Sequence, residues 1–321
     1  MERQASRVSD VVVRVRVPAK VNLFLGVRGI RDDGYHEVVS IMQTVGLHDV
    51  IEAQLFGAAS AQHPAARKRM TVTLGHDGGP RVPDGDGNLA LRAARRLAET
   101  FGAEHDNGQH EDDPRSHLEL HKRIPVAAGM AGGSADAAAA LVALNELWGC
   151  ELDRDELRAI GAELGADVPF CVTGGTALAT GTGTATAQVL CRGTYHWVVG
   201  VQDEPLPTAE VYRTWDRIGT PSEVEPDAVL QALRTEDPEA LGAALYNDLQ
   251  LAAFHVRPHL GETHRRLLDE GALGALVSGS GPTLVALAES ASHARHLAGL
   301  TRDRFSRVHV VTSPAGGPDL T

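Results

Sequence analysis

Residues 125–139 read PVAAGMAGGSADAAA, a run of small residues that a proline opens and an alanine-rich segment closes. Residues 118–124, LELHKRI, precede it with the alternation of a strand, and residues 135–148, ADAAAALVALNELW, follow it as a strong helix. Bare backbone lets amide N–H groups approach a ligand closely, and a helix N-terminus adds unpaired donors and a positive dipole end. The stretch therefore predicts either a phosphate-binding loop or a tight strand-to-helix turn with close packing.

Known glycine-rich patterns do not settle this choice. No GK[ST] follows the glycines, which excludes a Walker A loop. Ala127 stands where a GxGxxG pattern would begin, ahead of Gly129 and Gly132. The hydroxyl of Ser134 is suited to capping the helix, to ligating Mg²⁺, or to both.

The length and charge of the chain narrow the class of protein. Its 321 residues exceed one ordinary core, so two domains are expected. The net charge of −12 disfavours binding to nucleic acid or to an anionic membrane surface. No apolar run is long enough to span a bilayer, and the first ten residues lack the apolar core of a signal peptide, so a cytoplasmic protein is expected. Cys150, Cys171 and Cys191 form no CxxC pair, which argues against a disulfide framework or a zinc site.

Hydrophobic periodicity gives a coarse order of elements. Strands are expected at 11–27, in the segment after the DGYHE turn, at 118–124, at 195–201 and at 307–312, with a hairpin within 171–190. Helices are expected at 88–101, 135–148, 153–164, 225–236, 238–246 and 258–270, and strand–turn–helix patterns return at 273–300. Two polar inserts, 57–70 and 102–117, are expected to be loops, and His105, His110 and His117 are interpreted as exposed loop residues rather than metal ligands.

Two charged residues lie in unusual surroundings. Lys20 sits in the apolar strand PAKVNLFLG, where side chains two apart share a face, so Lys20 and Asn22 are expected to project together. Alternatively, Lys20 is an edge-strand lysine that protects the strand from aggregation. Asp167, in GADVPF, is placed either to cap a short helical turn or to pair with a buried cation. A carboxylate beside a substrate hydroxyl can accept its proton, and a nearby lysine keeps the carboxylate ionised.

Five motifs occur in order over about residues 11–312, and together they resemble the GHMP kinases. The motifs are PAKVNLFLGV, RDDGYHEVVSIMQTV, PVAAGMAGGSADAAAALVALN, GADVPF and SGSGPTLVAL. AKVNLFL beside DGYHE is the most specific part of the match, and it resembles the branch that acts on 4-diphosphocytidyl-2-C-methyl-D-erythritol. The resemblance implies an α+β fold with an N-terminal ribosomal-S5-like ATP-binding domain over residues 1–192 and a C-terminal ferredoxin-like α/β-plait domain over residues 193–321.

The resemblance also implies a catalytic pair and an ATP site. Lys20 and Asp167 match the catalytic pair, with Asp167 as general base. Asn88 and Lys122 match positions that line the adenine pocket, although helix capping and an exposed strand position explain them as well. The ATP phosphate loop would comprise Pro125, Val126, Ala127, Ala128, Gly129, Met130, Ala131, Gly132, Gly133, Ser134 and Ala135. Ala127 and Ala128 depart from the glycines common in the family, and an alanine that needs a positive φ would be strained.

For the substrate, the resemblance implies that Asn22 holds the reacting end and that Tyr35 and His36 recognise cytosine. Thr208 and Tyr212 would lie on the far side of the base, so that Tyr35 and Tyr212 sandwich it; alternatively, Tyr212 is a core aromatic on a helix. The SGSGPTLVAL segment would shape the substrate side, or it is a tight turn between a helix and a strand.

The reaction so implied is transfer of a phosphoryl group from ATP to the 2-hydroxyl of 4-diphosphocytidyl-2-C-methyl-D-erythritol, in isoprenoid synthesis by the non-mevalonate route. Mg²⁺ is expected to arrive with ATP, since no carboxylate cage for a metal is evident. The expected partners are these small molecules, with no nucleic acid and no membrane, in a monomer or weak homodimer. The alternatives are a GHMP kinase of the homoserine or mevalonate type and a non-catalytic nucleotide-binding module.

Overall fold

The computed structural model of the chain describes residues 11–32, 34–56, 71–79, 81–100, 115–221 and 223–321. The expected inserts at 57–70 and 102–117 lie outside these ranges, apart from residues 115–117. The elements in chain order are β1 (Val12–Ile30), β2 (His36–Phe56), β3 (Thr71–His76), η2 (Gly85–Gly87), α1 (Leu89–Thr100), β4 (Arg115–His121), α2 (Gly132–Leu147), α3 (Arg154–Leu164), α4 (Val168–Thr173), β5 (Thr176–Thr180), β6 (Ala185–Gln188), β7 (Tyr195–Val201), α5 (Thr208–Ile218), α6 (Asp227–Thr235), α7 (Pro238–Ala244), β8 (Tyr246–Asn247), α8 (Gln250–Val256), α9 (Pro258–Asp269), β9 (Gly274–Val277), β10 (Leu284–Ala288), α10 (Ala291–Thr301), η3 (Arg302–Arg304), β11 (Arg307–Ser313) and β12 (Asp319–Leu320).

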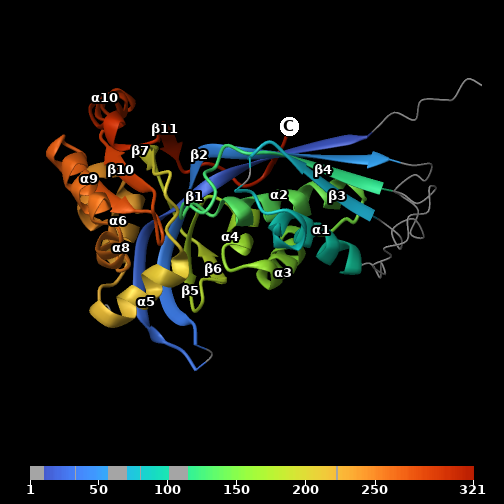
Figure 1. Cartoon of the computed structure of the whole chain (residues 1–321), viewed down its shortest axis with the longest axis horizontal. Helices are drawn as coiled ribbons and strands as arrows, with labels where there is room; N and C mark the ends of the chain where they lie inside the picture. Colours follow the sequence, from blue (N-terminus) through green and yellow to red (C-terminus); the bar gives the residue numbers. More distant parts are fainter. Residues whose placement is uncertain (1–10, 33, 57–70, 80, 101–114, 222) are drawn as a thin grey trace, which may run out of the picture.

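The larger sheet is built on the long antiparallel pair β1 and β2. Its strand order is β12-β1-β2-β4-β3, with β5 and β6 continuing from β2 and with β8 beside β1. Helices α1 to α4 lie along one face of this sheet (Figure 1). The alanine-rich α2 buries residues on all sides, because methyl side chains let it lie close to both the sheet and α1.

The smaller sheet has the order β11-β7-β10-β9, and its strands are antiparallel. Helices α5 to α10 gather around it at the other end of the molecule (Figure 1). The expected strand at 195–201 coincides with β7, and the expected helix at 258–270 is α9. Helix α8 had no counterpart in the periodicity, because its seven residues are too few to display a helical repeat.

The structure corrects two local expectations. Residues 171–173 belong to helix α4, so the expected hairpin is confined to β5 and β6. The turn of SGSGPTLVAL joins two strands, β9 and β10, rather than a helix and a strand. In both places a short buried segment carries no periodic signal that separates helix from strand.

The two sheets are tied together by late segments of the chain. Strands β8 and β12 both pair with β1, at Phe24–Leu25 and at Val15–Arg16 respectively. At the junction, the buried Gln43 donates to Thr176 at 2.9 Å and accepts from Ser313. The expected domain boundary at 192/193 falls between β6 and β7 and stays a prediction.

Candidate active site

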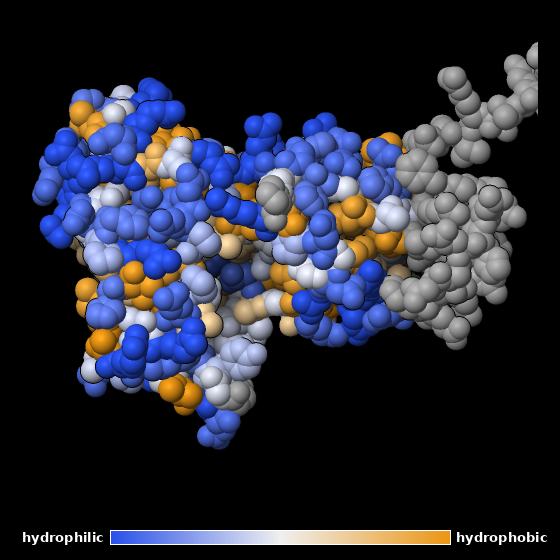
Figure 2. Space-filling model, viewed as in Figure 1, coloured by the Kyte–Doolittle hydropathy of each residue, from blue (hydrophilic) through white to orange (hydrophobic). Residues whose placement is uncertain are grey.

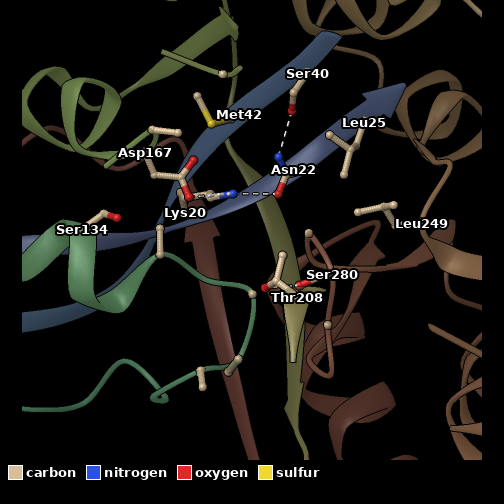
Figure 3. A pocket seen from close by; sticks show the side chains of 18 of the residues that line it. Lys20, Asn22, Leu25, Ser40, Met42, Ser134, Asp167, Thr208, Leu249 and Ser280 are labelled. Carbon is tan, nitrogen blue, oxygen red and sulfur yellow. Dashed lines mark hydrogen bonds and ion pairs between the residues drawn. The ribbon is translucent and has the colours of Figure 1, made fainter. Parts of the chain in front are cut away.

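A cavity of about 780 Å³ opens between the two sheets. Figure 2 shows the face hollowed between the C-terminal helices and the α2–α4 region, and Figure 3 shows its side chains. Four segments far apart in the sequence contribute to its wall: β1 and β2, the glycine-rich loop before α2, the start of α5, and the turn between β9 and β10. A pocket of this size at the junction of two sheets is a usual place for a small-molecule site.

Lys20 and Asp167 meet at the wall of this cavity. The ammonium of Lys20 lies 3.4 Å from Oδ2 of Asp167 and donates to Oδ1 of Asn22 at 2.8 Å. The Lys20 side chain is 7% exposed and that of Asp167 is 32% exposed, so the cation is buried while the carboxylate remains accessible. The predicted projection of Lys20 and Asn22 from one face of β1 is confirmed.

Asp167 occupies the N-cap position of α4 but does not cap it with its side chain. Its backbone is helical, with φ −84° and ψ −13°, whereas a capping residue needs an extended backbone. Pro169, which lacks an N–H, also removes one of the donors that a cap would satisfy. The capping interpretation is therefore wrong, and the carboxylate is left to face Lys20.

Ser40 fixes the orientation of Asn22, although the sequence analysis did not single it out. Its hydroxyl donates to the carbonyl of Phe24 at 2.7 Å, so it must accept from Nδ2 of Asn22, which lies 2.8 Å away. Asn22 then presents its carbonyl oxygen to Lys20 (Figure 3). Ser40 lies on β2, which pairs with the strand that carries Lys20. Ser40 can be recognised as a neighbour of this site only once the pairing of the two strands is known.

The glycine-rich loop has the backbone of an anion site. Ala131 precedes α2 in the left-handed region at φ 56°, and the first helical bond is the one from Ala135 to Ala131. The N–H groups of Gly132, Gly133 and Ser134 therefore have no partner within the helix, and all three residues line the cavity. Ser134 lies inside the first turn, so the prediction that it caps the helix is wrong.

Backbone strain, which the sequence analysis raised for Ala127 and Ala128, occurs at Ala127 and at Ala131 but not at Ala128. Ala127 has a φ of 53° and Ala131 a φ of 56°, a region that costs an alanine about 1–2 kcal/mol. Between them, Gly129 has a φ of 75°, and a Cβ there would lie 2.0 Å from the carbonyl oxygen of Ser278. The Ser278 hydroxyl donates to the Gly129 carbonyl at 2.9 Å, which locks the β9–β10 turn onto the loop.

Only part of the predicted loop faces the cavity. Pro125, Val126, Met130 and Ala135 do not line it, and Met130 and Ala135 are fully buried in the core. Residues that line the cavity are interspersed with residues buried in the core here, so consecutive residues of this stretch do not all face the cavity. The residues that do line it are Ala127, Ala128, Gly129, Ala131, Gly132, Gly133 and Ser134.

Asn88 and Lys122 do not line this cavity, and their place in an adenine pocket stays a prediction. Asn88 caps α1: its Oδ1 accepts from the N–H of Ala90 at 2.9 Å, and its Nδ2 donates to the carbonyl of Pro83 at 3.0 Å. Lys122 is buried, and its ammonium contacts two carboxylates, Asp49 and Asp136. The side chains of both residues are thus occupied by internal partners.

Two of the predicted substrate residues come from α5. Thr208 and Tyr212 line the cavity, and the Thr208 hydroxyl lies 2.9 Å from that of Ser280. Burial, helped by the negative charge of Asp167, raises the pKa of Tyr212 to about 12, so its phenol stays protonated. Tyr212 is therefore a neutral aromatic wall near the Asp167 carboxylate.

His36, rather than Tyr35, lies against Tyr212. The two ring centroids are 4.6 Å apart, and Nε2 of His36 is 2.7 Å from the carboxylate of Asp216. Neither Tyr35 nor His36 is among the lining residues, and Tyr35 is 69% exposed, so the structure does not form the expected pair of tyrosines around a base. Asp216 lies one turn after Tyr212 on α5, which places it toward the same side.

Apolar walls complete the cavity and were missed by sequence reasoning. They come from Leu25, Val38, Met42, Leu206 and Leu249. A bulge between Asn22 and Phe24 shifts the alternation of β1, so that Leu25 lines the cavity where strict alternation would place Phe24. Bulges of this kind are not visible in a hydrophobic pattern.

The described residues contain no group of three or more His, Cys, Asp or Glu side chains suited to a metal ion. His117, expected in a loop, lies in β4 beside Glu119, while His105 and His110 fall outside the described residues. Cys171 and Cys191 are free thiols. No helix in the described part of the chain is long and apolar enough to cross a bilayer.

Comparison with known proteins gives one consistent answer. Residues 88–175 match the GHMP kinases N terminal domain, and residues 229–299 match the GHMP kinases C terminal domain. A protein of Salinispora tropica named 4-diphosphocytidyl-2-C-methyl-D-erythritol kinase is 46% identical over 292 residues, which cover 89% of this chain and 86% of that protein. A protein of Nocardioides sp. with the same name is 46% identical over 307 residues, covering 95% of this chain and 97% of that one.

Solved structures agree with the sequence relatives. A crystal structure of 4-(cytidine 5'-diphospho)-2C-methyl-D-erythritol kinase superimposes with a TM-score of 0.75 and 33% identity, covering 94% of this chain and all of that one (100%). A homoserine kinase from Cytophaga hutchinsonii shares the fold with a TM-score of 0.72 at 19% identity, covering 97% of each chain. The expected two-domain α+β fold is thereby confirmed, and the chain belongs to the GHMP kinase family.

Proposed function

We propose that this chain transfers the γ-phosphoryl group of ATP to the 2-hydroxyl of 4-diphosphocytidyl-2-C-methyl-D-erythritol. The observation that carries the proposal is the 3.4 Å approach of Lys20 and Asp167 beside the backbone N–H groups at the start of α2. The relatives that cover most of the chain and carry the corresponding name support the choice of substrate. GHMP kinases use ATP, and the loop geometry suits its phosphates.

Asp167 is the group proposed to receive the hydroxyl proton. Its carboxylate is partly exposed to the cavity, and no capping bond to α4 competes for its oxygens. Lys20 adds positive charge where charge develops on the transferring phosphoryl group. Asn22, held by Ser40, keeps the ammonium in place, so the pair is positioned before substrate arrives.

The loop residues are proposed to hold the nucleotide phosphates. The N–H groups of Gly132, Gly133 and Ser134 supply donors without helical partners, and the dipole of the 16-residue helix α2 adds to their effect. The hydroxyl of Ser134 lines the cavity and has no hydrogen-bond partner among the described residues, so it fits a hydrated Mg²⁺ carried with ATP. Such an ion would supply charge neutralisation of the phosphates.

His36 and Tyr212 are proposed to recognise the cytosine. Because the Asp216 carboxylate can only accept, Nε2 of a neutral His36 carries the proton, and Nδ1 is left as an acceptor. An acceptor at this place suits the exocyclic amine of cytosine and not the carbonyl of uracil. The Tyr212 ring offers an apolar face next to it.

A coupled assay of ADP release tests the proposal. The purified chain is given Mg·ATP and 4-diphosphocytidyl-2-C-methyl-D-erythritol, with homoserine and mevalonate in parallel reactions. Turnover with the cytidine compound alone is the expected result. Turnover with homoserine or mevalonate in its place would assign the chain to a different GHMP kinase, and ATP binding without any turnover would make it a non-catalytic nucleotide-binding module.

A further inference from the structure

A second groove is formed where α5 packs beside α8 (Figure 1). Its volume is about 610 Å³, a size that suits a small molecule. None of its lining residues lines the cavity to which Lys20 and Asp167 belong, so the groove is a separate site. The polar residues that line it are Glu210, Arg213, Thr214, Arg217, His255 and Arg257.

The helical repeat of α5 separates the groove from the cavity. Thr208 and Tyr212, which line the cavity, are one turn apart on one face of α5. Arg213 and Arg217 are also one turn apart, and at about 3.6 residues per turn they lie roughly 140° further around the helix. Buried residues of α5 such as Val211 pack in the core and fix the helix between the two sites.

The groove carries more positive than negative charge. Three guanidinium groups line it, those of Arg213, Arg217 and Arg257, together with the carboxylate of Glu210. A further carboxylate, that of Glu204, lies 3.6 Å from Nε of Arg257, but its side chain is 74% exposed. Three cations against two carboxylates leave a positive excess in a chain whose net charge is −12. Such a local excess attracts an anion against the overall field of the protein.

Two of the arginines are anchored but keep donors available. Nε of Arg213 donates to the carbonyl of Ala209 at 3.1 Å, and Nη2 of Arg217 donates to the hydroxyl of Thr214 at 3.2 Å. Among the described residues, neither guanidinium contacts a carboxylate. A guanidinium has five N–H donors, so most of those on Arg213 and Arg217 remain free to bind a ligand.

The third arginine is incompletely satisfied inside the protein. Nη1 of Arg257 donates to the carbonyl of Val256 at 3.2 Å. Its Nε is buried and has no hydrogen-bond partner in the described part of the chain, since Glu204 lies beyond hydrogen-bond distance. A buried donor without an acceptor is costly, so this position favours a ligand that brings acceptor atoms to Arg257.

A ligand with two adjacent phosphoryl groups fits these donors. Arg213 and Arg217 are four residues apart on one helix, so their Cβ atoms are about 5–6 Å apart. Guanidinium groups bind phosphate oxygens in bidentate pairs. A diphosphate can therefore contact both arginines of α5 and also Arg257, whereas a single carboxylate group would leave most of these donors unused. His255 offers a further ring N–H on the same groove.

We propose that this groove is a second binding site of the chain, for a small molecule that carries a diphosphate group. Arg213, Arg217 and Arg257 bind the phosphoryl oxygens, while Glu210, as an anion, is not a ligand. The inference does not depend on the proposed kinase reaction, because no residue of the cavity takes part in it. A ligand in the groove would contact the helix that carries Tyr212 on its other face.

Calorimetric titration of the full chain with inorganic diphosphate tests the proposal. The titration is carried out in metal-free buffer of low ionic strength, because metal ions chelate diphosphate and salt screens the exposed arginines. Binding to the wild type is expected. Diphosphate bound at the loop before α2 would also contribute heat, so variants are needed to locate the site.

Two double variants locate it. Arg213→Gln/Arg217→Gln removes two exposed cations of the groove and should weaken one binding event about tenfold or more. Arg265→Gln/Arg295→Gln removes the same charge from exposed positions on α9 and α10 outside the groove. This matched control should change Kd less than about twofold, because these charges lie away from the ligand. Diphosphate bound at the loop before α2 should be unaffected in both variants.

The remaining outcomes overturn the inference. Absence of binding to the wild type would do so, and so would the same Kd in all three proteins, which would place the diphosphate elsewhere. Equal weakening in both double variants would mean that only the overall charge matters. Inorganic sulfate should bind at least about tenfold more weakly, since one tetrahedral group reaches fewer of the arginines. Sulfate binding as tight as that of diphosphate would overturn the assignment to a diphosphate ligand. None of these results affects the proposed roles of Lys20 and Asp167.

Discussion

Ser40 accepts a hydrogen bond from Nδ2 of Asn22 at 2.8 Å, and this contact sets which end of the Asn22 amide faces Lys20. The proposed catalytic pair is thereby connected to strand β2. Asp167 contacts Lys20, Lys20 donates to Asn22, and Asn22 donates to Ser40 on β2. Ser40 in turn donates its hydroxyl proton to the carbonyl of Phe24, so its oxygen is left to accept from Asn22. The geometry of the pair is fixed by the fold before any substrate binds.

Replacement of Ser40 by alanine is expected to lower kcat about tenfold with a smaller effect on KM. The change leaves the buried Nδ2 of Asn22 without an acceptor, and a flipped amide would point donors at the Lys20 ammonium. It should also cost about 1–3 kcal/mol of stability. Ser116→Ala is the matched control, because Ser116 is equally buried and accepts from Trp148 at 2.9 Å, away from the cavity. An equal loss of kcat in both variants would show that stability, not orientation, is responsible.

Replacement of Asp167 by asparagine is expected to leave the fold and ligand binding intact while kcat falls about 10²–10⁴-fold. The amide keeps the size of the side chain but cannot accept the hydroxyl proton. Single-turnover kinetics with Mg·ATP and the cytidine substrate measure the effect, and Asp155→Asn supplies an exposed control on α3. A kcat near that of the wild type would remove Asp167 from the role of general base.

The sequence predicted the parts of this site that depend on local pattern. The shared face of Lys20 and Asn22 followed from strand alternation, and the small residues before α2 followed from the needs of a backbone site. The resemblance to GHMP kinases placed Asp167 in the same site, which spacing alone does not do. Each of these depends on a few adjacent residues or on an ordered set of motifs.

The features of the site that the sequence did not reveal depend on contacts between residues that lie far apart in the chain. Lys122 looks like an exposed strand lysine until Asp49 and Asp136 are brought to it from other elements. His36 reaches Tyr212 only because α5 folds back over β2, and Tyr35, one residue earlier, points elsewhere. Tyr35 lies in the turn before β2 and is 69% exposed, whereas His36 is the first residue of β2, so adjacent residues of DGYHE have different surroundings.

Glycine in place of Ala131 is expected to stabilise the protein modestly. Relief of a positive φ gains about 1–2 kcal/mol, and the added freedom of the unfolded chain costs about 0.5–1 kcal/mol, so Tm should rise by a few degrees at most. Ala128→Gly is the matched control in the same loop, because Ala128 is not among the residues with positive φ, and it should lower Tm. Thermal unfolding of the three proteins decides the point. A fall in Tm for Ala131→Gly would mean that its methyl group stabilises the loop by more than the strain costs.

Loss of Asp216 is expected to weaken the preference for cytidine over uridine. Without this carboxylate, either nitrogen of His36 can carry the proton, so the Nδ1 acceptor is no longer assured. The ratio of kcat/KM values for the cytidine substrate and its uridine analogue should fall by about tenfold or less in Asp216→Ala, mostly through KM. Glu210→Ala, on the same helix but facing a separate groove, is the control. An unchanged ratio would mean that the base is recognised without His36.

The stability of the protein should depend on Asp136 in a way that reveals its ionisation state. Its pKa in the folded chain is about 8, above the ordinary value of 3.8, so the unfolded chain loses this proton at lower pH than the folded chain does. The carboxyl group therefore costs no stability below about pH 4, and the cost grows as pH rises towards about 8 and then levels off. Since Asp136→Asn has no such cost, its Tm relative to the wild type should increase steadily between about pH 5 and 8. Thermal melts at several pH values measure this difference, with Asp155→Asn as a control that should follow the wild type throughout. A Tm difference that stays constant over this range would mean that Asp136 is already ionised in the folded chain throughout it, which would contradict the raised pKa.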